Sequence, residues 1–355
     1  MRVLIVHPGP DFSVADVYRG WAEGLRELGC EVALYNLGTN DRLYFYSRAL
    51  IDTEEKDETG HPIVRQAMTQ LEAIRASMQG LTHACYSFWP DIVLFVSAFF
   101  VEAGTFALMR ARGHKLVLLH TESPYQDDEQ LTRAEFADLN LLNDPVNIRA
   151  YEELAPALYM PHAYRPEVHH PRTGPLNPEL AADLLFIGTA FPTRVKFFEA
   201  MVGRDFEGTD FLLGGSYWTD ETSEDSPLRK FLSQEGQCVD NSETAELYRH
   251  ARCGINFYRR ESEEGHSGEG WAMGPREVEM AASELFFLRD SRPESDEVFP
   301  MLPSFTGPDD AREKLRWWLA HEGKRLEAAR AARAAIADRT FTGNAGRLLR
   351  ALDNL

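Results

Sequence analysis

Residues 1–35, MRVLIVHPGPDFSVADVYRGWAEGLRELGCEVALY, decide the fold class. Arg2–Val6 is an apolar, β-branched run that residues 8–10 (PGP) close, which predicts a buried strand. Apolar residues from Val14 to Leu28 recur at helical spacing, and Gly29 ends that helix before a second apolar run at Glu31–Tyr35. Because strand, helix and strand form one βαβ unit, the sequence predicts a doubly wound, parallel α/β domain.

The same alternation continues through the first half of the chain. We expect strands at residues 91–96, 115–119, 139–142 and 157–160, and helices at 102–112 and 146–154. Residues 52–60 (DTEEKDETG) are charged and rich in turn formers, so they predict a surface loop. A helix is expected to follow from Ile63 to about Tyr86.

A second α/β pattern follows a change in composition at residues 161–178, which contain five prolines and few aliphatic residues. Strands are expected at 183–187, 210–213, 253–258 and 285–288, helices at 194–201, 242–250 and 276–282, and a helical tail at 311–355. The predicted organisation is an N-terminal domain (1–165), a linker (166–180) and a C-terminal domain (181–335). The last helix (336–355) is expected to pack back on the first domain.

Composition limits the classes of partner. The chain has 355 residues, 44% of them hydrophobic, with 37 Lys and Arg against 56 Asp and Glu and a net charge of −19. This excess of negative charge argues against extended nucleic-acid binding. No apolar run is long enough to span a membrane, no signal peptide precedes the first strand, and the four cysteines lack CxxC spacing, so we expect a soluble, cytoplasmic protein with reduced thiols.

Three residues of the first half are candidates for catalysis. Asp11 lies in the loop after the first strand, where helix amides commonly border a ligand, although the loop is equally explained as a capped turn. His120 and Glu122 follow a buried strand, and either could act as general base or hold a sugar, or be structural. The acidic run 127–129 could bind a metal, but its position favours the first turn of a helix.

In the second half, residues 186–194 (FIGTAFPTR) join a strand to a helix. Gly188 and Thr189 allow close approach of the backbone to a diphosphate, and Arg194 at the helix start can pair with phosphate oxygens. An exposed arginine on an ordinary turn is the simpler alternative.

Residues 256–290, NFYRRESEEGHSGEGWAMGPREVEMAASELFFLRD, carry a glycine-rich polar loop between a strand and a helix. Such a loop is expected to be mobile and ordered by a ligand. Arg276 at the helix start suits phosphate, and Glu279 one turn later is placed for ribose hydroxyls, unless the two form a surface ion pair. Trp271 could stack on a base or sugar, or pin the loop. Asn256, Tyr258 and Gly274 complete the predicted donor-binding set.

This stretch resembles the C-terminal signature of CgeB-like glycosyltransferases, named from spore-coat maturation, within the group-1, GT-B superfamily. The resemblance rests on the strand ending in Asn256, on Arg276 and Glu279, and on the small residues 281–283 before an apolar strand ending in Asp290. The segment containing Gly188 and Arg194 is similar to the family's phosphate loop. The resemblance covers about residues 183–355, and the first half is similar only in pattern.

The resemblance implies a GT-B fold, with two facing Rossmann-like domains, parallel sheets and a cleft between them. It also implies a nucleotide-sugar donor, usually a UDP-sugar, with Glu279 on the ribose and Gly188, Arg194 and Arg276 near the diphosphate. Many retaining members have a glutamate eight positions before the ribose-binding one, where this chain has Trp271, so retention or inversion stays open.

The expected activity is sugar transfer from the donor to a hydroxyl acceptor. No DxD stands at a strand end, so we expect no metal and no cofactor beyond the nucleotide sugar. The acceptor stays open among protein, glycan, small molecule and modified base. The alternatives are an epimerase-like nucleotide-sugar enzyme on the same fold and a non-catalytic sugar-nucleotide-binding protein.

Overall fold

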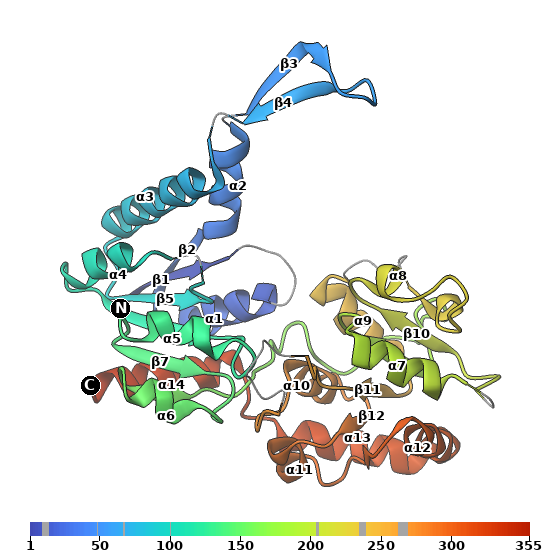
Figure 1. Cartoon of the computed structure of the whole chain (residues 1–355). Coiled ribbons are helices and arrows are strands. Elements are labelled where there is room, and N and C mark those ends of the chain that lie inside the picture. Colours follow the sequence, from blue (N-terminus) through green and yellow to red (C-terminus); the bar gives the residue numbers. More distant parts are fainter. Residues whose placement is uncertain are drawn as a thin grey trace. The chain divides into compact units, whose positions relative to one another are not determined.

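The computed structural model describes residues 1–8, 14–47, 49–66, 68–99, 101–203, 206–233, 239–261 and 269–355. The chain divides into two compact units (Figure 1). The first comprises Met1–Ser123, Asp127–Leu142 and Asn147–Tyr159, and the second Pro124–Gln126, Asn143–Val146 and Met160–Leu355. Two short segments of the first half therefore belong to the second unit.

A six-stranded parallel sheet forms the first unit, in the order β2-β1-β5-β6-β7-β8. Its strands are β1 (Arg2–His7), β2 (Glu31–Asn36), β5 (Ile92–Val96), β6 (Lys115–His120), β7 (Leu139–Leu142) and β8 (Ala157–Tyr159). Its helices are α1 (Ala15–Glu27), α2 (Leu37–Ser47), α3 (Gln70–Phe88), α4 (Ala103–Arg110), α5 (Asp127–Ala134) and α6 (Ile148–Glu152). The central strands β5, β6 and β7 are buried on both faces apart from Lys115, as helix-covered parallel strands require. All six predicted strands of this half are confirmed.

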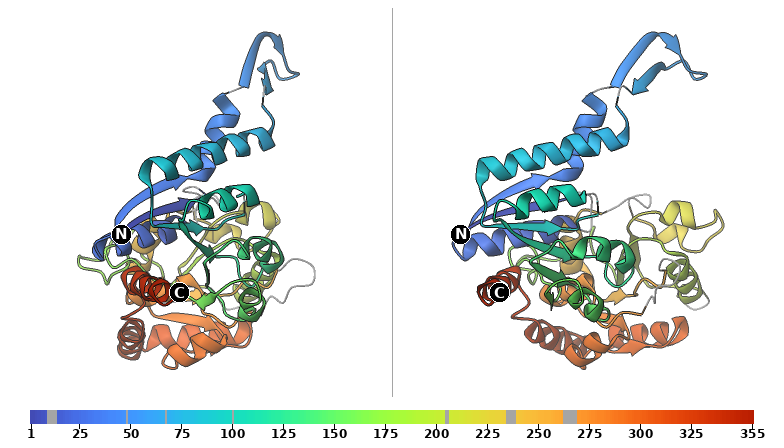
Figure 2. Two further views of the ribbon diagram at one scale, coloured as in Figure 1. Left: turned by 90° about the vertical axis from the view of Figure 1, so that its left-hand side faces the viewer. Right: turned by 60° about the vertical axis from the view of Figure 1, so that its left-hand side comes forward.

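The predicted loop at 52–60 and the predicted start of a helix at Ile63 are wrong. This region forms an antiparallel hairpin of β3 (Ala49–Lys56) and β4 (Pro62–Gln66), which extends from the ends of α2 and α3, away from the first sheet (Figure 2). Asp57 accepts hydrogen bonds from the backbone of Thr59 and His61, both at 2.9 Å, which closes the turn. The helix begins only at Thr69, whose side chain and backbone form a capping box with Glu72.

The second unit contains a five-stranded parallel sheet in the order β10-β9-β11-β12-β13. Its strands are β9 (Leu184–Ile187), β10 (Phe211–Gly214), β11 (Gly254–Asn256), β12 (Phe287–Asp290) and β13 (Ser304–Phe305). Its helices are α7 (Pro192–Met201), α8 (Trp218–Glu221), α9 (Asn241–His250), α10 (Pro275–Ala282), α11 (Pro293–Val298), α12 (Pro308–Ala320), α13 (Glu322–Ala335) and α14 (Phe341–Asp353), with a 3-10 turn at Arg229–Phe231. The predicted strands and helices of this half are confirmed, while α8, the 3-10 turn, α11 and β13 were not expected.

The strand order places a topological switch point in this sheet. From β9 the chain moves to β10 on one side, whereas β11 pairs with β9 on the other. Connections that leave neighbouring strands in opposite directions open a crevice at the carboxyl ends of these strands, where open α/β sheets bind ligands. The crevice lies between the residues that follow Ile187 and those that follow Asn256.

The proline-rich segment after Met160 is held to the rest of the second unit by hydrogen bonds. The backbone N–H of Tyr164 donates to the Arg339 carbonyl at 3.0 Å. Asn344 Nδ2 donates to the Pro161 carbonyl at 2.7 Å, and the backbone N–H of Asn177 donates to His250 at 3.0 Å. Groups far along the chain therefore provide hydrogen-bond partners for the backbone of a segment that prolines keep out of regular secondary structure.

The structure also bears on the predictions about membrane spans and cysteines. In the described part of the chain, no helix combines the length and apolarity needed to cross a bilayer. Cys30, Cys85 and Cys253 are free thiols in buried positions, and Cys238 lies outside the described residues.

The crossing of the loops after β9 and β10 depends on a glycine. Gly215 has φ +121°, and a Cβ there would lie 2.6 Å from the Gly188 carbonyl carbon. Gly208 also has a positive φ, +81°, but a Cβ there would meet open space. Comparing substitutions at the two glycines therefore separates the cost of a positive φ from the cost of a steric clash.

We predict that Gly215→Ala destabilises the second unit much more than Gly208→Ala. The left-handed backbone alone costs alanine about 1 to 2 kcal/mol, and overpacking against backbone at Gly215 adds about 1 to 3 kcal/mol. Midpoints of chemical unfolding, compared among wild type and the two variants, measure this difference. Equal losses of stability would show that the Gly188 crossing is not close-packed.

Candidate functional site

The loop after β9 is built around Gly188. Its N–H donates to the Gly214 carbonyl at 2.9 Å, and its carbonyl accepts from Trp218 Nε1 at 2.8 Å. A Cβ on Gly188 would lie 3.0 Å from the Phe186 ring and 3.4 Å from the Arg194 guanidinium. The absence of a side chain therefore keeps this turn close to its neighbours at the switch point.

Arg194 joins the two loops that border the crevice. Its Nε donates to the Phe257 carbonyl and its Nη1 to the Thr189 carbonyl, both at 3.0 Å. Burial, followed by the nearby charge of Arg276, lowers the pKa of Arg194 to about 10. Arg194, predicted to bind phosphate, thus also holds the β9 loop against the β11 loop, and burial is the main cause of its lowered pKa.

Helix α10 presents its first turn to the same edge of the sheet. Gly274 precedes Pro275, whose fixed φ and missing N–H suit the first helical position. Arg276 Nη1 donates to the Tyr248 hydroxyl at 3.5 Å, and this hydroxyl is also hydrogen-bonded to Glu279. Tyr248 was not recognised from the sequence, because its position on α9 carries only a helical packing pattern.

Asn256 ends β11 at the switch point and is only 6% exposed. Its Nδ2 is buried and has no hydrogen-bond acceptor among the described residues. Since a buried amide donor without a partner costs about 1 to 3 kcal/mol, Asn256 is a group that a ligand would satisfy.

Arginine side chains and aromatic rings alternate along this edge. Arg194 lies over Phe186 and Phe191, at 5.5 and 5.1 Å from the ring centroids. The same alternation continues through Phe191, Arg259, Tyr125, Arg292 and Tyr258, with guanidinium-to-centroid distances between 4.0 and 5.9 Å. Cation–π contacts hold several guanidinium groups near one another without neutralising them.

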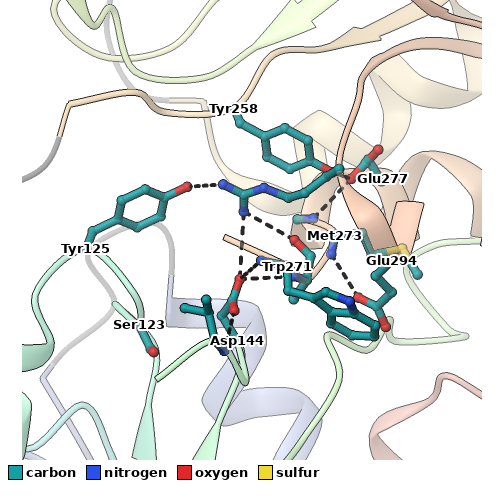
Figure 3. A network of polar contacts seen from close by, with 12 residues as sticks. Ser123, Tyr125, Asp144, Tyr258, Trp271, Met273, Glu277 and Glu294 are labelled. Carbon is teal, nitrogen blue, oxygen red and sulfur yellow. Dashed lines mark hydrogen bonds and ion pairs between the residues drawn. The ribbon is translucent and has the colours of Figure 1, made fainter. Parts of the chain in front are cut away.

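Three carboxylates clamp the backbone before α10 (Figure 3). Asp144 accepts the N–H groups of Trp271 and Ala272, both at 2.9 Å. Glu294 accepts the N–H of Met273 at 2.8 Å. Glu277 accepts the N–H of Gly274 at 3.0 Å, so four successive amides of this segment are fixed.

Arg292 completes the clamp. Its guanidinium donates to the Tyr125 hydroxyl at 2.8 Å and the Ala272 carbonyl at 3.2 Å, and lies 4.0 Å from the Asp144 carboxylate. Gly270 is in contact with this pair, because a Cβ there would lie 2.8 Å from Arg292 Nη1. Residues 269–274 are therefore anchored, and the mobility predicted for the earlier part of the loop falls on residues 262–268, outside the described residues.

Glu277 is fully buried beneath this segment. The hydroxyls of Tyr258 and Ser295 donate to its carboxylate. Burial nevertheless raises the pKa of Glu277 to about 7. Tyr258, predicted to bind the donor, thus directs its hydroxyl to Glu277 and its ring to Arg292.

The backbone of Trp271 lies in the clamped segment. Its N–H donates to Asp144, and its carbonyl accepts from the Glu294 N–H at 3.0 Å. These bonds favour the interpretation that this residue pins the loop.

The first-unit candidates lie at the carboxyl ends of the first sheet's strands. His120 is buried, its Nε2 is 2.8 Å from Asn140 Oδ1, and burial lowers its pKa to about 4. Because Asn140 Nδ2 donates to the Ala134 carbonyl, Asn140 Oδ1 is the acceptor and His120 Nε2 carries the proton. Glu122 is half-buried, two residues after β6. Asp11 lies outside the described residues.

The acidic run 127–129 forms the first turn of α5. Asp127 accepts hydrogen bonds from Ser123, Gln130, Asn147 and Tyr151. These contacts are those of a buried structural carboxylate, which supports the predicted helix start over a metal site.

The predicted donor residues Gly188, Thr189, Arg194, Asn256, Tyr258, Gly274, Arg276 and Glu279 all belong to the second unit, on the segments that follow β9 and β11. Sequence reasoning missed Asp144 and Arg292. Asp144 lies 127 residues before its partner Trp271, so no local pattern reports their contact. Arg292 lies two residues beyond a buried strand end, a position typical of site residues in parallel sheets.

Comparisons with known proteins agree with this geometry. Residues 194–349 match the model of a family described as glycosyl transferase-like. Among solved structures, sucrose-phosphate synthase from Thermosynechococcus elongatus aligns over 100% of both chains, with TM-score 0.64 and 10% identity. Anabaena HepE in complex with UDP-glucose gives the same coverage, TM-score and identity. A Listeria monocytogenes protein described as a UDP-N-acetylglucosamine 2-epimerase covers 99% of this chain and 95% of its own, with TM-score 0.58 and 13% identity.

No curated protein sequence matches the chain. At identities of 10 to 13% the structural likeness shows the fold. The predicted fold class is confirmed: two parallel α/β sheets with helices in a GT-B-type chain. The glycosyl transferase-like part of the sequence resemblance is confirmed for residues 194–349, and the CgeB-like assignment stays a prediction.

Glu277 should give the protein a specific pH dependence. With a pKa raised from 4.5 to about 7, the native state keeps a proton that the unfolded state releases between these values. The free energy of unfolding should therefore fall as pH rises through this window, by on the order of 1 to 3 kcal/mol. Glu277→Gln should remove this decrease, since a neutral amide does not titrate.

The measurement is denaturant unfolding of wild type and Glu277→Gln between pH 5 and 8. His120 and His162, whose pKa values are lowered to about 4 by burial, contribute with the opposite sign in both proteins, so the difference isolates Glu277. Glu322→Gln, at a largely exposed position, is the control. A pH-independent difference between wild type and Glu277→Gln would refute the raised pKa.

Proposed function

We propose that the protein is a glycosyltransferase that takes a sugar from a nucleotide-sugar donor, a UDP-sugar, bound by the second unit. The observation that carries the proposal is the position of two arginines at the switch point: Arg194 joins the loops after β9 and β11, and Arg276 lies in the first turn of α10 at the same edge of the sheet. Like charges held together in a partly buried site favour an anionic ligand. The family match of residues 194–349 and the UDP-glucose bound to HepE support a nucleotide sugar as that anion.

The residues suggest which part of the second unit would bind each part of the donor. The diphosphate would lie against the Gly188 turn and the start of α10, where backbone N–H groups, the helix dipole and Arg276 attract negative charge. Glu279, one turn further along α10, would accept hydrogen bonds from the two ribose hydroxyls. Asn256 Nδ2 would donate to an oxygen of the donor, which would satisfy its buried amide.

The proposed reaction replaces one bond to the anomeric carbon with another. The bond to the terminal phosphate oxygen breaks, an acceptor hydroxyl oxygen forms the new bond, and its proton passes to a base. Arg276, Arg194 and the dipole of α10 would stabilise charge on the departing diphosphate, so the proposed mechanism requires no metal. Glu122 is our first choice for the base, with His120 second and Asp11 third.

His120 has a second interpretation. Its low pKa and the proton on Nε2 leave Nδ1 as its acceptor, so neutral His120 could hold a sugar hydroxyl as readily as it removes a proton. We propose that the first unit binds the acceptor. None of these residues indicates which acceptor it is.

A nucleotide-sugar epimerase is the second candidate, because a protein described as one shares the fold. Incubation with a panel of nucleotide sugars separates the candidates. A transferase passes the sugar to an acceptor or to water and releases the nucleoside diphosphate, whereas an epimerase changes the configuration of the sugar and leaves it attached to the nucleotide. Binding without either change would identify a non-catalytic nucleotide-sugar-binding protein. The CgeB-like subgroup is the finer assignment that we propose for the transferase.

Arg276→Ala should weaken UDP binding by about 10- to 150-fold. A charge-assisted hydrogen bond to phosphate contributes about 1.5 to 3 kcal/mol, and each 1.4 kcal/mol corresponds to a tenfold change. Calorimetric titration of UDP measures the dissociation constant. Arg347→Ala, which removes a partly exposed arginine paired with Asp338, is the matched control and should bind UDP like wild type. An unchanged dissociation constant in Arg276→Ala would remove the phosphate assignment.

Glu122→Gln should lower turnover at saturating donor by about 10²- to 10⁴-fold if Glu122 is the base, with the UDP dissociation constant unchanged. Glu129→Gln, an exposed carboxylate on α5, is the matched control and should retain the wild-type rate. His120→Gln tests the second choice, with thermal unfolding to check that loss of the Asn140 contact leaves the fold intact. Wild-type rates in both Glu122→Gln and His120→Gln would refute the catalytic assignment and leave the donor assignment standing.

A further inference from the structure

A cavity of about 490 Å³ lies in the second unit, at the amino ends of its strands. Residues 248–252 and 283–286, which line it, immediately precede β11 and β12. The predicted donor residues follow β9 and β11 at the carboxyl ends. The cavity is therefore separate from the candidate donor site, at the opposite edge of the same sheet.

Four arginines line this cavity: Arg172, Arg249, Arg252 and Arg325. The last three have carboxylate partners, with Arg249 paired to Glu246 at 2.6 Å, Arg252 to Asp183 at 2.6 Å and Arg325 to Glu322 at 3.6 Å. Arg172 has no ion pair with any residue that the structure describes. Of the two lining carboxylates, Glu322 pairs with Arg325, and Glu284 lies 3.5 Å from Arg330 and 3.9 Å from Arg333.

The positive charges in this cavity affect one another. Arg252 is among the causes that lower the pKa of Arg325, after burial, and Arg172 is among those that lower the pKa of His250, again after burial. Part of the side chain of Arg252 is exposed, at 46%. At this cavity the charge that no described carboxylate pairs is that of Arg172, and an anion would neutralise it.

A buried hydroxyl supplies independent support. Ser283 is 3% exposed and lines the cavity, and its Oγ has no hydrogen-bond partner among the described residues. Apolar side chains, Leu176, Leu285, Phe286 and Leu326, cover the remaining wall. Polar and charged residues form most of the lining beside these apolar side chains, which suits a small organic anion with a polar body.

We propose that this cavity binds a small phosphate-bearing organic anion, with Arg172 and Arg252 on the phosphate and the Ser283 hydroxyl as a further hydrogen-bond partner. The body of the ligand contacts the apolar wall. A phosphate pairs bidentately with guanidinium groups, and a sugar or similar body fills the remaining space.

The occupant would be coupled to the donor site. Tyr248 lines the cavity, while its hydroxyl is hydrogen-bonded to Arg276 and Glu279. Helix α10 has Arg276 in its first turn and ends at Ser283. A ligand that fixes this end of α10 and the ring of Tyr248 should change the affinity for UDP, and by linkage UDP should change its affinity equally.

The test is a calorimetric titration of glucose 6-phosphate into the Arg276→Ala protein, whose donor site is impaired. One binding event is expected, and adding Arg172→Gln or Ser283→Val should weaken it at least tenfold, whereas Arg347→Gln should not. Inorganic phosphate should compete for the site, which would assign recognition to the phosphate group. Absence of binding, or binding that is insensitive to both Arg172→Gln and Ser283→Val, would overturn the proposal.

Wild-type protein provides the second arm. UDP is titrated with and without saturating glucose 6-phosphate, and its dissociation constant should differ between the two conditions but not in the Arg172→Gln variant. An unchanged constant in wild type would refute the coupling. Because the first arm does not require UDP to bind, failure of the proposed function and failure of this pocket are distinguishable.

Discussion

Burial of the Arg194 guanidinium, with the charge of Arg276 nearby, is the constraint on which the crevice edge of the second unit depends. Arg194 would be expelled toward solvent if the Thr189 and Phe257 carbonyls and the Phe186 and Phe191 rings did not hold it. Desolvation makes each such contact stronger and each missing one more costly. Arg194 is thus held mainly by carbonyls and rings, with Glu261 nearby, whereas Arg292 also lies 4.0 Å from the Asp144 carboxylate.

Carboxylates hold the backbone of the segment before α10, next to the arginine edge. Asp144, Glu294 and Glu277 do not face the arginine edge as simple counter-ions, because their oxygens receive the backbone amides of residues 271–274. Hydrogen bonds from several backbone amides together stabilise the negative charge of a buried carboxylate. The segment before α10 is consequently rigid, which fixes the start of the helix that carries Arg276 and Glu279.

The fold and half of the candidate site could be predicted from the sequence because their signals are local. Apolar runs and helical spacing located the strands of both sheets except β13, and glycine with arginine after a strand singled out Gly188, Arg194 and Arg276 as candidates. The hairpin at 49–66 was missed because its turn-proximal half, DTEEKDETG, is a charged run without period-two alternation, which resembles a loop. The contact of Asp144 with Trp271 could not be predicted, since it depends on tertiary structure alone.

The Asp144 clamp also limits how the chain can be divided. Tyr125 and Asp144 belong to the second unit although about 120 and 140 residues precede them. A fragment that begins at Met160 would contain the whole five-stranded sheet, yet it would leave the amides of Trp271 and Ala272 without their acceptor and Arg292 without Tyr125. The two halves are therefore not interchangeable modules: any recombination or truncation that separates residues 124–146 from the glycine-rich loop removes part of the loop's own scaffold.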